Sequence, residues 1–198
     1  MKITALLVLK CDPRSDGSDP VILANATDVN HFGYFQRVTV RQFIVFVGRT
    51  VAKRTPPDQR HSVQHEGSYL NFCVFRKCFD FGGFGFSADL KNTANRMWLN
   101  ADQVIDEYQK CFGDSWRSIQ ADSTQPWPYL NEALTKFQDP GEADKLLKIQ
   151  RELDETKIIL HKTIDSVLER GEKLDSLVEK SSDLSAASQV CILTLKDV

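Results

Sequence analysis

Hydrophobic and polar positions in the first part of the chain predict a β-hairpin followed by a helix. Residues 2–10 are predominantly apolar, which is typical of a strand buried on both faces, and residues 21–26 can return beside it. A helical stripe follows, with apolar residues at i, i+3, i+4, i+7 and i+11: Val40, Phe43, Ile44, Val47 and Val51. Phe46 lies off this stripe, so we expect the helix to be covered on two sides until Pro56-Pro57 ends it.

The next part of the chain has a mixed pattern. Several phenylalanines between residues 66 and 102 indicate strands, but Gly82-Gly83 and Gly85 interrupt them. Helical spacing returns at residues 101–112, and a short helix is predicted at residues 129–137. The order of these elements predicts a small α+β domain.

The carboxy-terminal segment has a different pattern, and Asp139-Pro140-Gly141 separates it from the domain. From Leu146 onward, seam positions recur with strict 3-4 spacing, which specifies a left-handed coiled coil. A helix from residue 142 to the end would be on the order of 80 Å long. Such a helix has one narrow apolar stripe, so we expect it to be poorly ordered until it meets partner helices or folds back on its own domain.

Composition supports this division and excludes several functions. The 198 residues have a net charge of -2, which argues against a protein that binds mainly nucleic acid. Residues 139–198 carry more acidic than basic side chains and no aromatic residue, whereas residues 1–138 have a small basic surplus. The 5 cysteines include no CxxC pair, which is typical of a reduced cytoplasmic chain. We find no catalytic constellation, metal site or cofactor motif, and no apolar run long enough to span a membrane.

Arg170 lies in the middle of the seam. A guanidinium cannot lose its charge, so burying it requires that partner helices supply polar acceptors at that level. The alternative is that Arg170 points sideways into water while its aliphatic stem covers the seam. The heptad pattern alone leaves both interpretations open.

Two parts of the chain resemble a known family. Residues 152–161 (ELDETKIILH) and 167–175 (VLERGEKLD) are similar to the SNARE motif of R-SNAREs, in particular to the lipid-anchored, longin-type YKT-six family in its plant form. Residues 31–37 (HFGYFQR) and 126–129 (PWPY) resemble the longin domain of that family. The resemblance covers roughly residues 1–66 and 103–189, and a joint match of this length is highly specific.

The resemblance implies that the chain has two regions with different functions. Residues 1–138 would form a profilin-like longin domain whose hydrophobic groove, with Phe43 on its helix, can hold the SNARE motif of residues 139–198 in a closed form. Arg170 would be the central ionic-layer residue, facing glutamines from three other helices in a parallel four-helix bundle. The packing layers would be Leu146, Ile149, Leu153, Thr156, Leu160, Thr163, Val167, Leu174, Leu177, Ser181, Leu184 and Ser188. The implied role is membrane fusion in ER–Golgi, Golgi and endosomal or vacuolar transport, by a cytoplasmic protein peripherally associated with these membranes.

The sequence departs from the family pattern in two places. Residues 67–102 do not match the middle strands of the family, so we expect the sheet to be incomplete there. The family match also stops near residue 189, and prenylation needs a cysteine fourth from the end, where this chain has Leu195. We therefore expect this form to lack its own lipid anchor, with Cys191 at most a weak candidate for a single acyl chain.

A different function class remains open from the sequence. A longin-like domain could present an ordinary homodimeric coiled coil and act as a scaffold. In a symmetric dimer two Arg170 side chains would face each other, which is unfavourable. Arg170 is therefore the residue that separates the two interpretations.

Overall fold

A single mixed β-sheet organises the chain. The computed structural model describes residues 3–11, 18–56, 59–64, 71–77, 81–87, 93–123, 126–138, 158–161 and 163–195. Within these residues the sheet has six strands in the order β2-β1-β5-β4-β3-β6. They are β1 (Ile3–Lys10), β2 (Val21–Thr27), β3 (Gln59–Gln64), β4 (Asn71–Lys77), β5 (Phe81–Ser87) and β6 (Ile158–His161). Neighbouring strands are antiparallel except β3 and β6, which are parallel.

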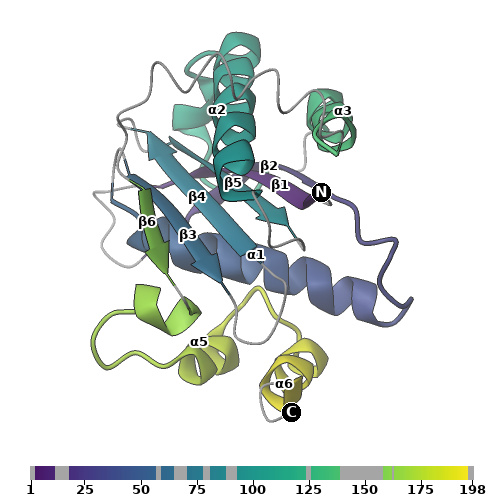
Figure 1. Cartoon of the computed structure of the whole chain (residues 1–198), viewed down its shortest axis with the longest axis vertical. Coiled ribbons are helices and arrows are strands. Elements are labelled where there is room, and N and C mark those ends of the chain that lie inside the picture. The colour runs from purple at the N-terminus through teal and green to yellow at the C-terminus, as the bar shows by residue number, and fades with distance from the viewer. Residues whose placement is uncertain are drawn as a thin grey trace.

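Helices cover both faces of the sheet (Figure 1). Helix α1 (Gln36–Arg54) lies along one face, and α2 (Thr93–Phe112) and α3 (Pro128–Lys136) lie on the other. Strand β1 is buried from both sides, because Leu7 belongs to the apolar cluster that contains Val47 of α1, whereas Leu6 and Val8 belong to the cluster that contains Ile105 of α2. The predicted α+β class, hairpin and helices are confirmed, and α2 begins earlier than the sequence pattern indicated.

The expectation of an incomplete sheet is wrong. Strand β5 pairs with β1 on one side and with β4 on the other, so residues 71–77 and 81–87 supply two interior strands. Gly82, Gly83 and Gly85 weaken the local preference for a strand. Pairing along both edges of β5 overrides that preference, and sequence patterns do not report such pairing.

The carboxy-terminal segment folds back on the domain, which is one of the two outcomes expected for an unpartnered stripe. We call residues 158–161 and 163–195 the tail. It contains β6, the 3-10 helix η2 (Ile164–Val167), α5 (Leu174–Lys180) and α6 (Ala186–Leu195), and it does not form one straight helix. Figure 1 shows η2, α5 and α6 gathered along the side of the molecule where α1 lies.

Candidate functional site: the surface of α1 and β3 that holds the tail

The tail begins its contact with the domain through the backbone. Strand β6 adds to the edge of β3 in parallel register, from Arg60 opposite Ile158 to Val63 opposite His161. An edge strand presents unpaired N–H and C=O groups, and β6 satisfies those of β3 on that side. The edge of β3 therefore fixes the register of the first described residues of the tail.

Apolar side chains of the tail then complete the core on the α1 side of the sheet. They share one cluster with Ile44, Phe46, Val47 and Val51 of α1. The fully buried tail members are Ile164, Val167, Leu174, Val178, Leu184 and Ile192. Burying one such side chain contributes about 1.5–3 kcal/mol. The tail is thus held chiefly by the hydrophobic effect.

The predicted packing-layer residues, taken together with Cys191, divide into four groups in this structure. Val167, Leu174, Leu184 and Ser188 are buried against the domain, and Thr163, Leu177 and Ser181 are partly buried. Leu160 lies in β6 opposite Ser62, and Cys191 lies in α6. Leu146, Ile149, Leu153 and Thr156 lie outside the described residues.

Two phenylalanines of α1 face the tail to different degrees. Phe43, which the resemblance places on the groove, is partly buried and packs against the shared cluster. Phe46 is a fully buried member of that cluster, and the rings of Phe43 and Phe46 are 6.5 Å apart between centroids. The expectation that α1 is covered on two sides is confirmed, and Phe46 is more deeply buried than its position off the stripe suggested.

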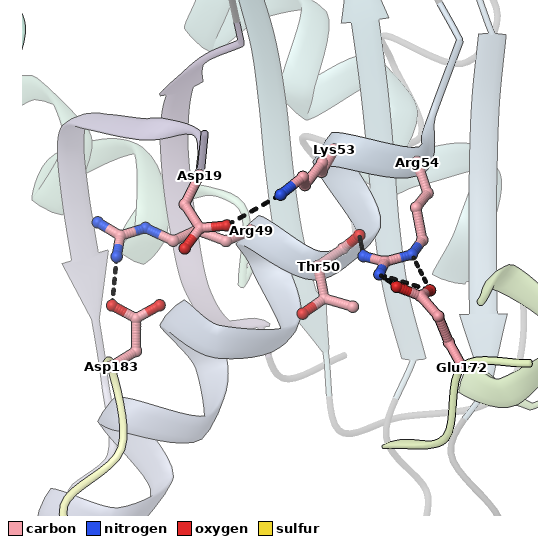
Figure 2. Close-up of polar contacts among 7 residues, drawn as sticks. All are labelled: Asp19, Arg49, Thr50, Lys53, Arg54, Glu172 and Asp183. Carbon is pink, nitrogen blue, oxygen red and sulfur yellow. Dashed lines mark hydrogen bonds and ion pairs between the residues drawn. The ribbon is translucent and has the colours of Figure 1, made fainter. Parts of the chain in front are cut away.

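One charged contact joins the end of α1 to the tail. The Arg54 guanidinium donates to both carboxylate oxygens of Glu172, with Nη2–Oε1 at 2.7 Å and Nε–Oε2 at 3.0 Å (Figure 2). Arg54 Nη1 also donates to the Thr50 carbonyl at 2.9 Å, which fixes the orientation of the guanidinium. Glu172 also accepts a hydrogen bond from the Glu169 backbone N–H. These bonds, that from Arg54 above all, lower the pKa of Glu172 below its ordinary value.

A second charged contact lies near the middle of α1. The Arg49 guanidinium donates to Asp183 of the tail and to Asp122, which precedes α3, at 2.5 Å. Figure 2 shows the Asp183 carboxylate directly opposite Arg49. Burial raises the pKa of Asp183, an effect that Arg49 opposes and the neighbouring Asp19 and Asp122 reinforce. Arg49 thus binds two carboxylates, and the one from the tail carries a desolvation cost.

Neutral polar groups fix α6 beside α1. Gln42 Oε1 accepts hydrogen bonds from the backbone N–H and hydroxyl of Ser185, at 3.1 and 3.0 Å. The hydroxyl of Ser188, which is buried, donates to Thr39 Oγ1 at 3.1 Å. Each such bond contributes about 1 kcal/mol, but it specifies how α6 is aligned.

The predicted ionic-layer residue lies in a turn of the tail. Arg170 is exposed, and Gly171 beside it has φ of +97°. The Glu172 N–H donates to the Glu169 carbonyl at 3.0 Å and closes this turn. A residue with positive φ cannot belong to a continuous α-helix. The tail therefore breaks at the level where the heptad pattern places its centre.

Local sequence patterns do not identify the charged residues of this contact. Arg49, Arg54, Glu172 and Asp183 lie far apart in the chain, and no local spacing relates them. A signal was present in the charge distribution: residues 29–57 contain no acidic residue, and the carboxy-terminal segment has an acidic surplus. That signal predicts attraction between the two segments, but it does not identify the pairs.

Glu172 provides a test of the charged contact at the end of α1. We expect Glu172→Gln to weaken docking of the tail by about 1 kcal/mol, roughly fivefold in the docking equilibrium, since the Glu172 side chain is 30% exposed and partly screened. Hydrogen exchange of the α5 and α6 amides measures the change. Glu179→Gln removes the same charge from an exposed position of α5 and is the matched control. Equal exchange in the two variants would contradict the role of Glu172.

The same contact predicts an acid dependence. The pKa of Glu172 is lowered in the docked state from an ordinary value of 4.5. Its contribution to docking is therefore complete above pH 4.5 and is lost as the pH falls through the lowered value. We expect the difference in exchange between wild type and Glu172→Gln to disappear on acidification. A constant difference at all pH values would refute this origin.

Asp183 is expected to behave in the opposite way. Because its pKa is raised in the docked state, the ionised carboxylate opposes docking relative to a neutral group. We expect Asp183→Asn to leave the tail docked at least as firmly as in the wild type, because the amide oxygen still accepts from Arg49. Release of the tail in this variant, to the extent seen in Glu172→Gln, would show that attraction to Arg49 outweighs the desolvation cost.

The described residues contain no candidate metal site and no candidate membrane span. They contain no group of three or more His, Cys, Asp or Glu side chains that could hold a metal ion. No helix among them has both the length and the apolar character needed to cross a membrane. The arrangement binds a segment of the chain itself.

Comparison with known proteins places the chain in a family. The family model described as Synaptobrevin matches residues 145–190. The chain is 69% identical over 190 residues to the VAMP-like protein YKT61 of Arabidopsis thaliana, covering 96% of this chain and 92% of the relative. It is 58% identical over 195 residues to the VAMP-like protein YKT62 of the same plant, covering 96% of this chain and 92% of the relative. It is 37% identical over 179 residues to the synaptobrevin homolog YKT6 of Saccharomyces cerevisiae, covering 89% of this chain and 88% of the relative. These relatives are SNARE proteins rather than enzymes, and the chain belongs to the synaptobrevin family as an R-SNARE of the YKT6 type, with a role in vesicle trafficking.

Proposed function

We propose that this R-SNARE alternates between the docked form and an open form that donates one helix to a four-helix SNARE bundle. Residues 1–138 are the longin domain and residues 139–198 the SNARE motif in this proposal. In the bundle Arg170 occupies the central ionic layer and meets glutamines from three partner helices. The bundle drives vesicle fusion in ER–Golgi, Golgi and endosomal or vacuolar transport, with the protein acting from the cytoplasmic side of these endomembranes.

The observation that carries the proposal is that docking and bundle formation use the same side chains. Val167, Leu174, Leu184 and Ser188 are buried against the domain in the docked form, and they are also positions of the heptad seam. A side chain cannot be buried in both places at once. The two forms therefore exclude each other, and the domain competes with the partner helices for the motif.

The state of Arg170 supports the same two-state behaviour. In the docked form its guanidinium is exposed, where it keeps its hydration at no cost. In the bundle the glutamine side chains supply the acceptors that a buried guanidinium requires. Arg170 thus stabilises only the bundle with partners that supply acceptors, and it does not stabilise the docked form. A symmetric homodimer would leave the Arg170 guanidinium without acceptors.

Gly171 provides a test of the competition between the two forms. Alanine at this position is strained by about 1 kcal/mol at the positive φ of the docked turn and favours a helix by about 1 kcal/mol. An added Cβ meets nothing within 4 Å, so the effect is confined to the backbone. Both contributions shift Gly171→Ala toward the open form, by about thirtyfold in total. Faster assembly with three soluble glutamine-contributing SNARE fragments is the expected result.

A matched control is available in the domain. Gly113 also has a positive φ, of +54°, with open space around it, but it follows α2 and lies away from the motif. Gly113→Ala should lower the free energy of unfolding without changing the rate of assembly. If both variants assemble at the wild-type rate, the docked form does not limit assembly and the competition proposed here is wrong.

Arg170→Gln tests the ionic layer separately from docking. Because Arg170 is exposed in the docked form, hydrogen exchange of the tail should be unchanged, whereas the thermal stability of the assembled bundle should fall. Lys173→Gln removes the same charge from an exposed position off the seam and is the control. Bundles of equal stability from the two variants would refute the assignment of Arg170.

A further inference from the structure

Exposed apolar side chains gather where α1 begins. Tyr34 is 77% exposed, Phe35 is 90% exposed and Val38 is 56% exposed. Scattered exposed apolar residues are common, but two adjacent aromatic side chains and a valine one turn later form a contiguous feature. Packing in the core does not explain why these residues are apolar.

The backbone presents these side chains in a defined arrangement. The Arg37 guanidinium donates to the carbonyls of Phe32 and Asn30, at 3.1 and 3.0 Å, and holds the loop against the first turn of α1. The Gln36 N–H donates to the Gly33 carbonyl at 2.9 Å. Within this frame the rings of Tyr34 and Phe35 meet edge to face, with centroids 5.5 Å apart. The two rings are therefore held outward together.

The charged residues at the start of α1 are basic, and the acidic residue that precedes the loop, Asp28, accepts a hydrogen bond from the Asn30 N–H. Val38 and the exposed Arg41 lie at i and i+3 of α1, on one face, and Tyr34 lies in the turn just before the helix. Residues 29–57 contain no acidic side chain. Among the described residues Arg37 and Arg41 form no salt bridge, whereas Arg49, Lys53 and Arg54 further along α1 do.

Helix stability does not account for this arrangement. Basic residues in the first turns of a helix oppose its dipole, since the amino-terminal end is positive, and the first turn of α1 has no acidic residue. The face of α1 that holds α6 is a neighbouring one, where Thr39 contacts Ser188 and Gln42 contacts Ser185. The exposed face is therefore free while the tail is docked.

We propose that Tyr34, Phe35, Val38, Arg37 and Arg41, here called the aromatic-basic patch, bind the anionic surface of a lipid bilayer. Aromatic rings are favoured at the boundary between headgroups and hydrocarbon, and arginines beside them attract anionic headgroups. Charge complementarity selects this occupant, because the exposed rings lie beside the partly exposed Arg37 and the exposed Arg41, in a stretch of chain (residues 29–57) that has no acidic residue. The patch would bring the docked form to a membrane before the motif is released.

Vesicle co-sedimentation of the full chain tests this proposal. We expect the wild type to bind vesicles that contain phosphatidylserine in phosphatidylcholine more strongly than vesicles of phosphatidylcholine alone. Arg41→Ala should lower binding to the anionic vesicles about fivefold, because one arginine near such a surface contributes that much. The double variant Tyr34→Ser with Phe35→Ser should lower it further. Circular dichroism should be unchanged in both, because these side chains are exposed.

Two variants serve as controls for apolar area and for charge. Val190→Ser removes an exposed apolar side chain from α6, and Lys110→Ala removes an exposed cation from α2. Both should bind as the wild type does. Absence of wild-type binding to the anionic vesicles, or equal losses in patch and control variants, would overturn the proposal. So would a double variant that binds vesicles normally but sediments as a smaller species, which would identify a second copy of the chain as the occupant.

Discussion

The burial of one narrow apolar stripe is the constraint on which the rest of this structure depends. Val167, Leu174 and Leu184 cannot remain in water without cost, and the segment that carries them has too few other apolar residues to form a core alone. In the isolated chain the stripe is buried against α1, as an added layer of the domain. A set of partner helices would offer an equivalent surface. Hydrophobic burial is non-directional, so it permits either solution.

Directional contacts select the docked arrangement among the ways in which the stripe could be buried. Strand β6 sets the register along β3, Arg54 holds Glu172, and Gln42 holds Ser185. Each contact contributes little, because several of these groups are partly exposed and all exchange water for a protein partner. The contacts thus specify one position of the tail, although each contact by itself is weak.

The turn at Arg170-Gly171 lies where the proposed open form would continue as one helix. Glycine accepts the positive φ that bends the tail back over α1, and it also permits a helix at a modest cost. The same bend leaves the guanidinium of Arg170 in water instead of in the seam. A charge that would be expensive to bury is thus kept solvated until suitable acceptors are present.

The sequence predicted most of the elements of the domain. Periodicity located the hairpin of β1 and β2, helix α1 and the carboxy-terminal part of α2. Each of these elements buries one or two faces, so the spacing of its apolar residues along the sequence shows its type. It did not predict β5 correctly, since the glycines of that strand are stabilised by pairing with β1 and β4. It also did not identify the ion pair between Arg54 and Glu172 or the deep burial of Phe46, because both depend on segments that are distant in the chain.

The sequence by itself determined that residues beyond 146 carry a heptad seam with an arginine at its centre, because side-chain spacing and type are written in the chain. Family membership follows from the same residues. Only the tertiary structure decided where the described part of that seam, from Val167 onward, is buried, because the choice depends on the relative free energies of surfaces far apart in the sequence. The exposed face of Tyr34, Phe35 and Val38 belongs to the same category, since a sequence records that residues are apolar but not that nothing in the fold covers them.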